Sequence, residues 1–270
     1  MDAMNKPITD LRNPMDLSGK SAIVTGGNRG IGFGISTAFS QRGAQVAILC
    51  RNIEGGRRAA DELRADGGKA IAVQCDITDA ESVTNAVKTV WEEFGRVDVL
   101  VNNAGVSSLP KSLIEFSDDI HEFTDIVDVN LFGTVRMSLA CAKRMAGAGG
   151  GCIINIASVG GFLSNSAAFN QPMSGYQVSK AALLHLTKVL AVELDPCNIR
   201  VNCVAPGPTH TDLDELLSEE MRKGMSTRTC TRRFGAGLEI GSMCAYLASN
   251  EAAQIDGSVI AVDGGILVKG

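Results

Sequence analysis

The sequence predicts an α/β fold, with a single domain built on a doubly wound parallel sheet of seven strands and with helices on both faces. Short runs rich in β-branched residues recur along the chain and are apolar on consecutive positions, as in strands buried on both faces of a parallel sheet. Helical patterns separate these runs, and such alternation forms right-handed βαβ units. The expected strands cover residues 21–25, 45–50, 69–75, 97–101, 151–157, 199–204 and 258–262.

Two of the intervening helices carry end signals in the sequence. Thr78 and Glu81 have the spacing of a capping box, which predicts that a helix begins there. A second helix is expected from near Tyr176 to Leu194, and it should stop before Pro196 because proline does not continue a helix.

The expected domain spans residues 19–270, since no linker or internal repeat divides the chain. Residues 1–18 are polar and contain Pro7 and Pro14, so they are expected to form a flexible tail rather than a signal peptide.

The composition narrows the classes of function. A net charge of −5 argues against general affinity for nucleic acid or anionic membranes, and no apolar run is long enough to span a bilayer. The eight cysteines include no CxxC pair, which favours free thiols in a reducing compartment over disulfides. The three histidines lack metal-ligand spacing, so no metal is expected. These features predict a cytoplasmic protein with a small-molecule partner.

The first expected strand leads directly into the glycine-rich run TGGNRGIG (25–32). Gly26, Gly30 and Gly32 let the backbone turn sharply and approach a ligand, while the following helix directs unpaired N–H groups at an anion. The run lacks the lysine of a P-loop, and its spacing is GxxxGxG. A turn without a ligand is the alternative, but the position between strand and helix favours phosphate binding.

Further motifs follow the glycine turn in a fixed order: NNAG (102–105), VNLFG (129–133), Ser158 at a strand end, YQVSK (176–180), PGPTHT (206–211) and VDGG (262–265). In this order they resemble the short-chain dehydrogenase/reductase family over about residues 18–268. The resemblance implies a Rossmann-type fold, a nicotinamide dinucleotide as cofactor and hydride transfer between this cofactor and a carbonyl or alcohol.

The end of the second expected strand favours NADP(H) over NAD(H). A carboxylate there would accept a hydrogen bond from the ribose 2′-hydroxyl of NAD, but this chain has Cys50 followed by Arg51. A guanidinium can bind a 2′-phosphate, and Arg29 adds a second cation on the same side. Asp76 resembles the family's adenine contact, its alternative role being to cap its own turn.

The expected cofactor-binding residues are Gly26, Asn28, Arg29, Gly30, Ile31, Gly32, Arg51, Asn52, Asp76, Ile77, Asn103, Ala104, Gly105, Tyr176, Lys180, Pro206, Gly207, Thr209 and Thr211.

A tyrosine four positions before a lysine predicts a proton-transfer pair. Tyr176 and Lys180 share one face of a helix, and an ammonium beside a phenol is expected to lower the phenol pKa from about 10. Tyr176 would then protonate a ketone oxygen as hydride arrives at its carbon. The resemblance implies this role, with Lys180 also bonding the nicotinamide ribose, Ser158 holding the carbonyl oxygen and Asn130 anchoring a water chain to the lysine.

Ser158 and Tyr176 lie 18 positions apart (176 − 158), a longer gap than is usual in the family. Ser164, Ser166 and Ser174 are rival serines within this insertion, but Ser158 directly ends a buried strand, where a side chain is held rigidly. The insertion is therefore expected to shape the substrate pocket.

The expected pocket residues are Ser158, Phe162, Phe169, Met173, Tyr176, Leu213 and Leu216. The segment 209–234 is expected to form a lid that closes over bound cofactor, with a hinge at Gly224. Packing beneath an ordinary surface helix is the alternative for the apolar residues of this segment.

Together these features predict an NADPH-dependent ketone reductase that can also run as a secondary-alcohol dehydrogenase. A sugar or polyol, a 3-oxoacyl thioester, a steroid and a secondary-metabolite ketone stay open as substrates. A catalytically idle NADP(H)-binding sensor is the alternative from another class. The helix that starts near Tyr176 is apolar nearly all round, which predicts a homo-oligomer. The resemblance implies a tetramer, with a dimer also possible.

Overall fold

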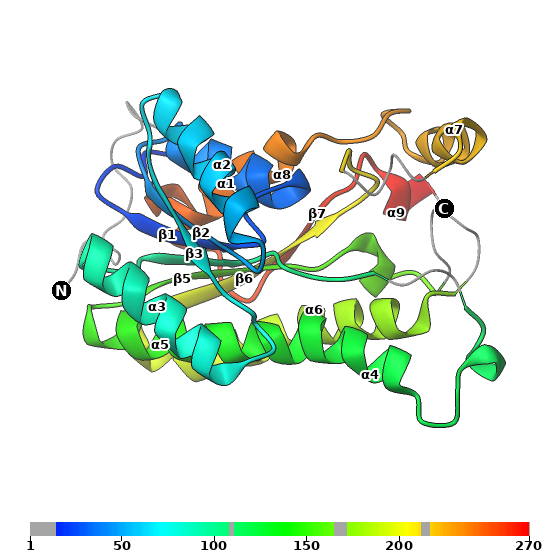
Figure 1. Cartoon of the computed structure of the whole chain (residues 1–270). Helices are drawn as coiled ribbons and strands as arrows, with labels where there is room; N and C mark the ends of the chain where they lie inside the picture. The colour runs from blue at the N-terminus through cyan, green and yellow to red at the C-terminus, as the bar shows by residue number, and fades with distance from the viewer. Residues whose placement is uncertain (1–14, 108–110, 165–171, 212–216, 270) are drawn as a thin grey trace.

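The computed structural model of the chain describes residues 15–107, 111–164, 172–211 and 217–269 (Figure 1). Seven strands in these ranges form one sheet in the order β3-β2-β1-β4-β5-β6-β7, and every neighbouring pair is parallel. The strands are β1 (Ser21–Thr25), β2 (Gln45–Cys50), β3 (Lys69–Gln74), β4 (Val99–Asn102), β5 (Gly151–Ile156), β6 (Ile199–Pro206) and β7 (Val259–Val262).

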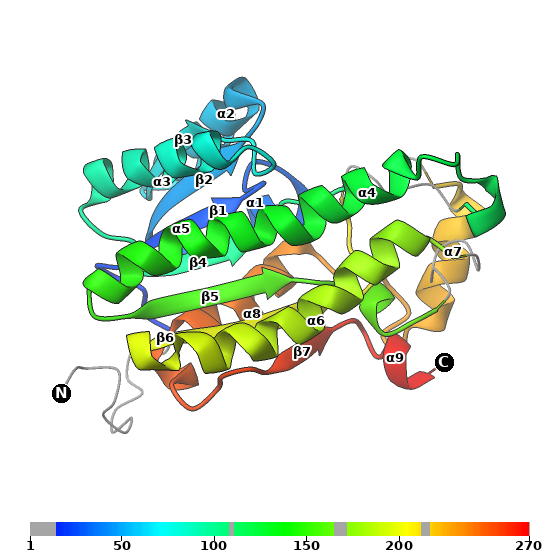
Figure 2. The ribbon, with the colours of Figure 1, turned by 90° about the horizontal axis from the view of Figure 1, so that it is seen from below.

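Helices cover both faces of this sheet, as the sequence predicts (Figures 1 and 2). One face carries α1 (Gly30–Ser40), α2 (Ile53–Ala65) and α8 (Gly237–Ala248). The other face carries α3 (Ala80–Phe94), α5 (Gly133–Gly147) and α6 (Ser174–Leu194). Shorter helices are α4 (His121–Val127), α7 (Glu219–Arg228) and α9 (Ile266–Lys269), and the π-helical turn Asp128–Phe132 joins α4 to α5.

The central strands are buried along their whole length, which explains their consecutive apolar residues. Every residue of β1, β4 and β5 is buried, because helices pack on both faces of the sheet there. The cysteines share this burial: all eight are free thiols, six of them buried, so the prediction of free thiols is confirmed.

The predicted capping box at Thr78 and Glu81 is wrong. Helix α3 begins at Ala80, and its N-cap is Asp79, whose carboxylate accepts a hydrogen bond from the Glu81 N–H (2.8 Å). The Thr78 hydroxyl instead donates to Asp76 Oδ1 (2.7 Å). A carboxylate one residue nearer the helix therefore takes the capping position, and Thr78 becomes part of the Asp76 turn.

The predicted flexible tail extends too far toward the domain. Leu17 is completely buried in the core against α1 and α8, and the Met15 N–H donates to Glu251 Oε1 (2.9 Å). These contacts fix residues 15–18 to the sheet, because a buried leucine side chain anchors the backbone on either side of it. Residues 1–14 lie outside the described ranges.

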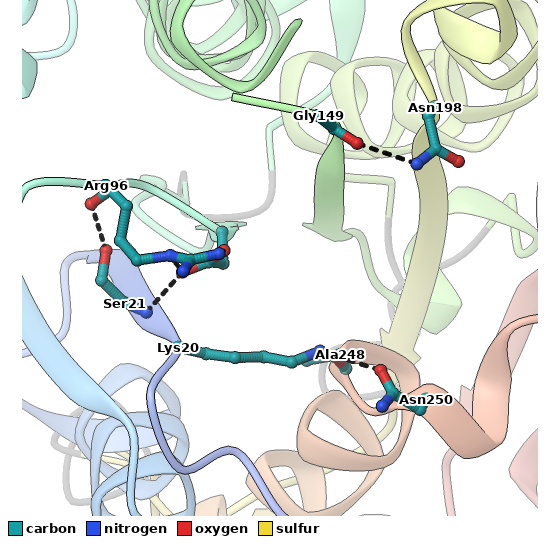
Figure 3. A network of polar contacts seen from close by, with 8 residues as sticks. Lys20, Ser21, Arg96, Gly149, Asn198, Ala248 and Asn250 are labelled. Carbon is teal, nitrogen blue, oxygen red and sulfur yellow. Dashed lines mark hydrogen bonds and ion pairs between the residues drawn. The ribbon is translucent and has the colours of Figure 1, made fainter. Parts of the chain in front are cut away.

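Side chains tie together the amino ends of the strands (Figure 3). Lys20 Nζ, at the start of β1, donates to the Ala248 carbonyl at the end of α8 (2.9 Å). The Ser21 hydroxyl donates to the Arg96 carbonyl, and the Asn198 amide donates to a carbonyl in the turn before β5 (2.9 Å). Polar groups at this edge therefore have partners within the protein.

At the opposite edge the chain leaves an opening. After β1 the chain moves to β2 and β3 on one side, whereas β4 lies on the other side of β1. Loops at such a reversal of strand order separate, and a crevice forms at the carboxyl ends of the strands. The fold therefore places a ligand site beside the ends of β1 and β4.

Candidate active site

The turn between β1 and α1 allows a ligand to approach the backbone. Gly30 has a φ of +52°, and a Cβ on Gly32 would lie 2.1 Å from the Gly26 carbonyl oxygen. Helix α1 begins at Gly30, and its N-cap, Arg29, makes no side-chain capping hydrogen bond. The N-cap side chain therefore does not occupy the first N–H groups of α1, and with the helix dipole these groups suit a phosphate.

A cleft of about 490 Å³ opens at the carboxyl ends of β1 to β4. Fourteen of the predicted cofactor-binding residues line it: Gly26, Asn28, Arg29, Gly30, Ile31, Gly32, Arg51, Asn52, Asp76, Ile77, Asn103, Ala104, Gly105 and Thr211.

Sequence reasoning missed further lining residues of the cleft, namely Leu49, Cys75, Thr78, Val106 and Val129. Each directly neighbours a position that motif or strand-end reasoning had selected. Extending each predicted segment of the site by one residue would have found all five.

Pro206, Gly207 and Thr209 do not line this cleft themselves. Pro206 ends β6 and pairs with Val262, and Thr209 bridges to Gly235. The loop they begin reaches the cleft at Thr211, whose Cγ2 would lie 3.3 Å from a Cβ on Gly30. These three residues therefore position the loop that crosses the glycine turn.

The end of β2 presents a thiol and a guanidinium rather than a carboxylate. Cys50 and Arg51 both line the cleft; Cys50 is nearly buried, and its Sγ donates to the Asn52 carbonyl (3.1 Å). Burial raises the pKa of the Cys50 thiol, which keeps it neutral at physiological pH. Asn52 caps α2 by accepting from the Gly55 N–H (3.2 Å).

Asp76 combines the two roles weighed from the sequence. It lines the cleft, and its carboxylate accepts hydrogen bonds from the Thr78 hydroxyl (2.7 Å) and the Thr78 N–H (2.9 Å). These bonds lower the pKa of Asp76, so the group stays ionised at neutral pH. The same turn that Asp76 closes also holds its carboxylate at the cleft wall.

Asn130 lies directly behind the cleft wall, on the π-helical turn between α4 and α5, and its neighbour Val129 and its partner Val106 line the cleft. Its side chain is completely buried; Nδ2 donates to the Val106 carbonyl (2.9 Å) and to Ser179 Oγ (3.0 Å). A Cβ on Gly105 would lie 3.0 Å from Asn130 Oδ1 and 3.5 Å from Lys180 Nζ. Asn130 and Lys180 therefore flank the same glycine of the NNAG motif.

Ser158, Tyr176 and Lys180 meet where β5 ends against α6. The side chains of Ser158 and Tyr176 lie close together, since a Cβ on Gly160 would be 3.4 Å from both Ser158 Oγ and Tyr176 Cε1. Lys180 Nζ donates to the Ile156 carbonyl (2.8 Å) and lies 5.8 Å from the centre of the Tyr176 ring. The fold thus gathers all four predicted catalytic residues, and the serine that meets the tyrosine is Ser158.

The expectation that Lys180 lowers the pKa of Tyr176 is wrong for the chain described here. Burial raises the pKa of Tyr176, and the hydrogen bond with Ser158 acts in the opposite direction. Burial also lowers the pKa of Lys180 to about 8. The ammonium is directed at the Ile156 carbonyl rather than at the phenol oxygen, so desolvation is the larger effect on the tyrosine.

The insertion after Ser158 is held at both ends by Gln177, which the sequence analysis missed. Gln177 Nε2 donates to the Leu163 carbonyl (2.7 Å), and its Oε1 accepts from the Met173 N–H (2.8 Å). Phe162, near the start of the insertion, is 51% exposed, whereas Met173, at its end, is buried. The predicted pocket residue Phe169 lies outside the described residues.

The predicted lid is described only in part. Leu213 and Leu216 lie outside the described residues, whereas α7 follows, with Met225 buried on one side. The hinge expected at Gly224 is not at a helix end: Gly224 lies inside α7, which continues to Arg228. The helix tolerates this glycine because the flanking residues keep the hydrogen-bond pattern.

In the described part of the chain, no group of three or more His, Cys, Asp or Glu side chains is arranged to hold a metal ion. None of the helices in this part combines the length and apolar character needed to cross a membrane.

Comparison with known proteins gives a consistent picture. The short-chain dehydrogenase family model described as enoyl-(acyl carrier protein) reductase matches residues 26–267. The 3-oxoacyl-(acyl-carrier-protein) reductase FabG of Vibrio harveyi is 38% identical over 252 residues, which cover 93% of this chain and 99% of that protein.

Two solved structures extend this likeness to the fold. The structure of 7α-hydroxysteroid dehydrogenase complexed with NADH and 7-oxoglycochenodeoxycholic acid has a TM-score of 0.88 and 33% identity, covering 94% of this chain and 96% of that one. A putative NAD(P)-dependent gluconate 5-dehydrogenase from Beutenbergia cavernae, with NADP bound at low occupancy, has a TM-score of 0.86 and 32% identity, covering 94% and 99%. The chain belongs to the short-chain dehydrogenase/reductase family of oxidoreductases, which act on CH–OH and C=O groups.

Proposed function

We propose that the protein is an NADP(H)-dependent ketone reductase that also oxidises the corresponding secondary alcohol. The observation that carries this proposal is the convergence of Asn130, Ser158, Tyr176 and Lys180 beside the cleft, behind its lining residues Gly105 and Val106. The glycine turn and the end of β2 line the cleft itself. A dinucleotide extending from the end of β2 past Gly105 would bring its nicotinamide to the four side chains.

Each of the four side chains has a role that its surroundings support. The bound cofactor supplies the hydride. Tyr176 donates its phenolic proton to the ketone oxygen, and Ser158, whose hydroxyl lies close to the Tyr176 ring, orients that oxygen. Lys180 binds the nicotinamide ribose in this proposal, because its Nζ would lie 3.5 Å from a Cβ on Gly105, which lines the cleft. Asn130 fixes the π-helical turn beside Lys180 through Val106 and Ser179.

The selection of NADP(H) rests on the end of β2. The solved relatives hold NADH in one case and NADP in another, so the shared fold allows both cofactors. Cys50 offers no negative charge to repel a 2′-phosphate, and Arg51 lines the cleft beside it. Cys50→Asp combined with Arg51→Ala should reduce kcat/KM for NADPH about 10- to 100-fold and raise it for NADH. Equal kcat/KM values for the two cofactors in the wild type would contradict this assignment.

The substrate is proposed to be a bulky, largely apolar ketone. Phe162, four residues after Ser158, is half-exposed, and Met173 closes the other end of the insertion. A 3-oxoacyl thioester is the second candidate, because the relative from Vibrio harveyi carries the name of a 3-oxoacyl thioester reductase. A sugar as the best substrate would overturn both assignments, since apolar walls offer few partners for its hydroxyl groups.

The decisive experiment is NADPH oxidation, followed at 340 nm with a panel containing a 3-oxoacyl thioester, a steroid ketone, an aliphatic ketone and a keto-sugar. Turnover that Tyr176→Phe abolishes supports the reductase. Tight NADPH binding without turnover on any member of the panel would instead favour the idle sensor, and would overturn the proposal.

A homotetramer is proposed for the assembly, with a dimer as the smaller possibility. Helices α5 and α6 lie side by side on one face of the sheet and expose large apolar side chains, with Leu139 56%, Val178 53% and Val192 77% exposed (Figure 2). Such a face favours burial against a second copy. Light scattering should give an oligomer mass, and Val192→Glu should shift it toward the monomer. A monomer of the wild type at micromolar concentration would contradict the proposal.

The site of action is proposed to be the cytoplasm. All eight cysteines are free thiols, which a reducing compartment maintains.

A further inference from the structure

A row of buried, hydrogen-bonded polar side chains runs from α5 across β4 and β5 to α6, below the catalytic residues. The Asn102 amide, on β4, donates to Ser138 Oγ on α5 (3.0 Å) and to Asn155 Oδ1 on β5 (2.9 Å). The Asn155 amide donates in turn to Thr187 Oγ1 on α6 (3.0 Å). These four residues, called the polar bridge here, are all buried, and Asn155 and Thr187 are completely so.

The polar bridge is the second hydrogen-bonded connection to α6 from this side; the first is formed by the catalytic residue Asn130. Asn130 and Ser179 connect the start of α5 to α6 directly (3.0 Å). Ser138 lies eight residues after Asn130 (138 − 130), and Thr187 lies eight residues after Ser179 (187 − 179). Eight residues advance about 12 Å along a helix. The two helices are thus joined at two levels with the same spacing on each.

The bridge also belongs to an ordered set of contacts between β5 and α6. Asn155 bonds Thr187, the Ile156 carbonyl accepts from Lys180 (2.8 Å), and Ser158 lies close to Tyr176. Later residues of the strand meet earlier residues of α6, so the three contacts follow one another along the interface between β5 and α6. The first of them, between Asn155 and Thr187, contains no catalytic group.

Apolar contacts alone fix the axial position of a helix poorly, because leucine and alanine surfaces repack after small shifts. Buried hydrogen bonds define the register, since a shift leaves donors and acceptors without partners where no water replaces them.

We propose that Ser138, Asn102, Asn155 and Thr187 are positioning residues that set where α6 stops along β5 and α5. They thereby hold Tyr176 and Lys180 opposite Ser158 and Asn130. This inference rests on the proposed function, because it assigns the bridge to the same catalytic group.

Thr187→Val tests the bridge with almost no change of shape. It removes the hydroxyl that accepts from Asn155, and a small displacement of reacting groups should reduce kcat roughly 10- to 100-fold. The Kd of NADPH, measured by fluorescence titration, should change less than about twofold, because the outer cleft is untouched. Thr187→Ser keeps the hydroxyl and should restore most of the turnover.

Asn155→Leu and Asn202→Leu form a matched pair of core variants. Asn202 is also a completely buried strand asparagine, but among the described residues its side chain bonds the Ile255 carbonyl (2.8 Å) and the Ser258 N–H (3.0 Å), on the segment leading to β7. Both variants should lower the melting temperature. Only Asn155→Leu should reduce kcat. If Asn155→Leu does not fold, Thr187→Val and Thr187→Ser decide the question.

An NMR titration of Lys180 in lysine-labelled, cofactor-free protein gives a readout that needs no substrate. The inference expects the Lys180 titration midpoint to move in Thr187→Val and to return in Thr187→Ser, with no change in Asn202→Leu. Unchanged Lys180 titration and unchanged kcat in Thr187→Val would overturn the positioning role. Absence of turnover in the wild type would overturn the proposed function instead, and the titration would still test the bridge.

Discussion

The two ends of the parallel sheet use polar residues in opposite ways. At the amino ends of the strands, polar side chains end on backbone groups of the protein itself (Figure 3). Arg200 is an example: its guanidinium donates to the Ile255 carbonyl (2.9 Å) and the Leu247 carbonyl (2.7 Å). Asp256 likewise accepts from the Val201 N–H (2.7 Å). Such bonds close the edge and contribute to stability.

At the carboxyl ends, the backbone and side chains line an open cleft instead. The glycine turn keeps side chains away from the N–H groups of α1, and Asp76 and Arg51 lie at the cleft wall. Burial of the charged Lys180 side chain costs desolvation free energy, as its lowered pKa shows. The residues that stabilise the sheet and the residues that act in catalysis thus lie at opposite ends of the strands. Variants at the amino ends should therefore lose stability, and variants at the carboxyl ends should lose activity.

The largest expected effect is loss of activity at the carboxyl end. Tyr176→Phe removes the proton donor but keeps the ring, so kcat should fall about 10²- to 10⁴-fold. The melting temperature and the Kd of NADPH should stay close to the wild-type values. Steady-state kinetics and a thermal scan on the same preparation measure both. Near-normal turnover in this variant would show that the phenol is not the acid.

Lys180→Met should reveal the stability cost of a buried amine. The pKa of Lys180 is about 8 in the folded chain, against 10.5 for an ordinary lysine. Between these values the unfolded chain binds more protons, so the free energy of unfolding of the wild type rises with pH. The free energy of unfolding of the wild type, relative to that of Lys180→Met, should rise by at most about 3 kcal/mol across this pH range. Below pH 8 the difference should be flat.

Urea unfolding at a series of pH values measures this difference, because other groups titrate equally in both proteins. A difference that falls between pH 8 and 10.5 would mean that the folded protein raises the pKa of Lys180 instead.

Arg200→Met tests the amino end. The variant removes the hydrogen bonds from Arg200 to the Ile255 and Leu247 carbonyls, of which Ile255 keeps its bond from Asn202, and should lower the free energy of unfolding by about 1–3 kcal/mol. Because Arg200 is remote from the cleft, kcat and KM should match the wild type. Urea denaturation and kinetics at a temperature where both proteins are folded separate the two effects. A marked loss of kcat would break the proposed division between the ends.

The smallest effect is expected at the base of the insertion. Gln177→Ala removes the two hydrogen bonds to Leu163 and Met173, so the insertion should lose its fixed position. The KM for ketones should rise about 3- to 10-fold, with the KM for NADPH unchanged. Gln177→Glu, which keeps one acceptor, should lie between the two. An equal rise in both KM values would assign Gln177 to the whole cleft.

The sequence alone determined the layout of the protein. Its apolar runs placed the strands within two or three residues, because a buried parallel strand requires consecutive apolar side chains. The order of glycine turn, NNAG, Ser158 and YQVSK placed the site at the carboxyl edge, since a parallel sheet brings all these strand ends together. The residue types of each segment therefore suffice to predict its place wherever the order of the segments along the chain determines that place.

Only the tertiary structure decided which groups become partners. Asp79 rather than Thr78 caps α3, and burial rather than the neighbouring ammonium sets the direction of the Tyr176 pKa. Gln177 and the link from Asn155 to Thr187 join positions far apart in the sequence, with no motif to announce them. The physical reason is that hydrogen-bond partners and desolvation depend on how helices pack on the sheet. Sequence spacing describes only one element at a time.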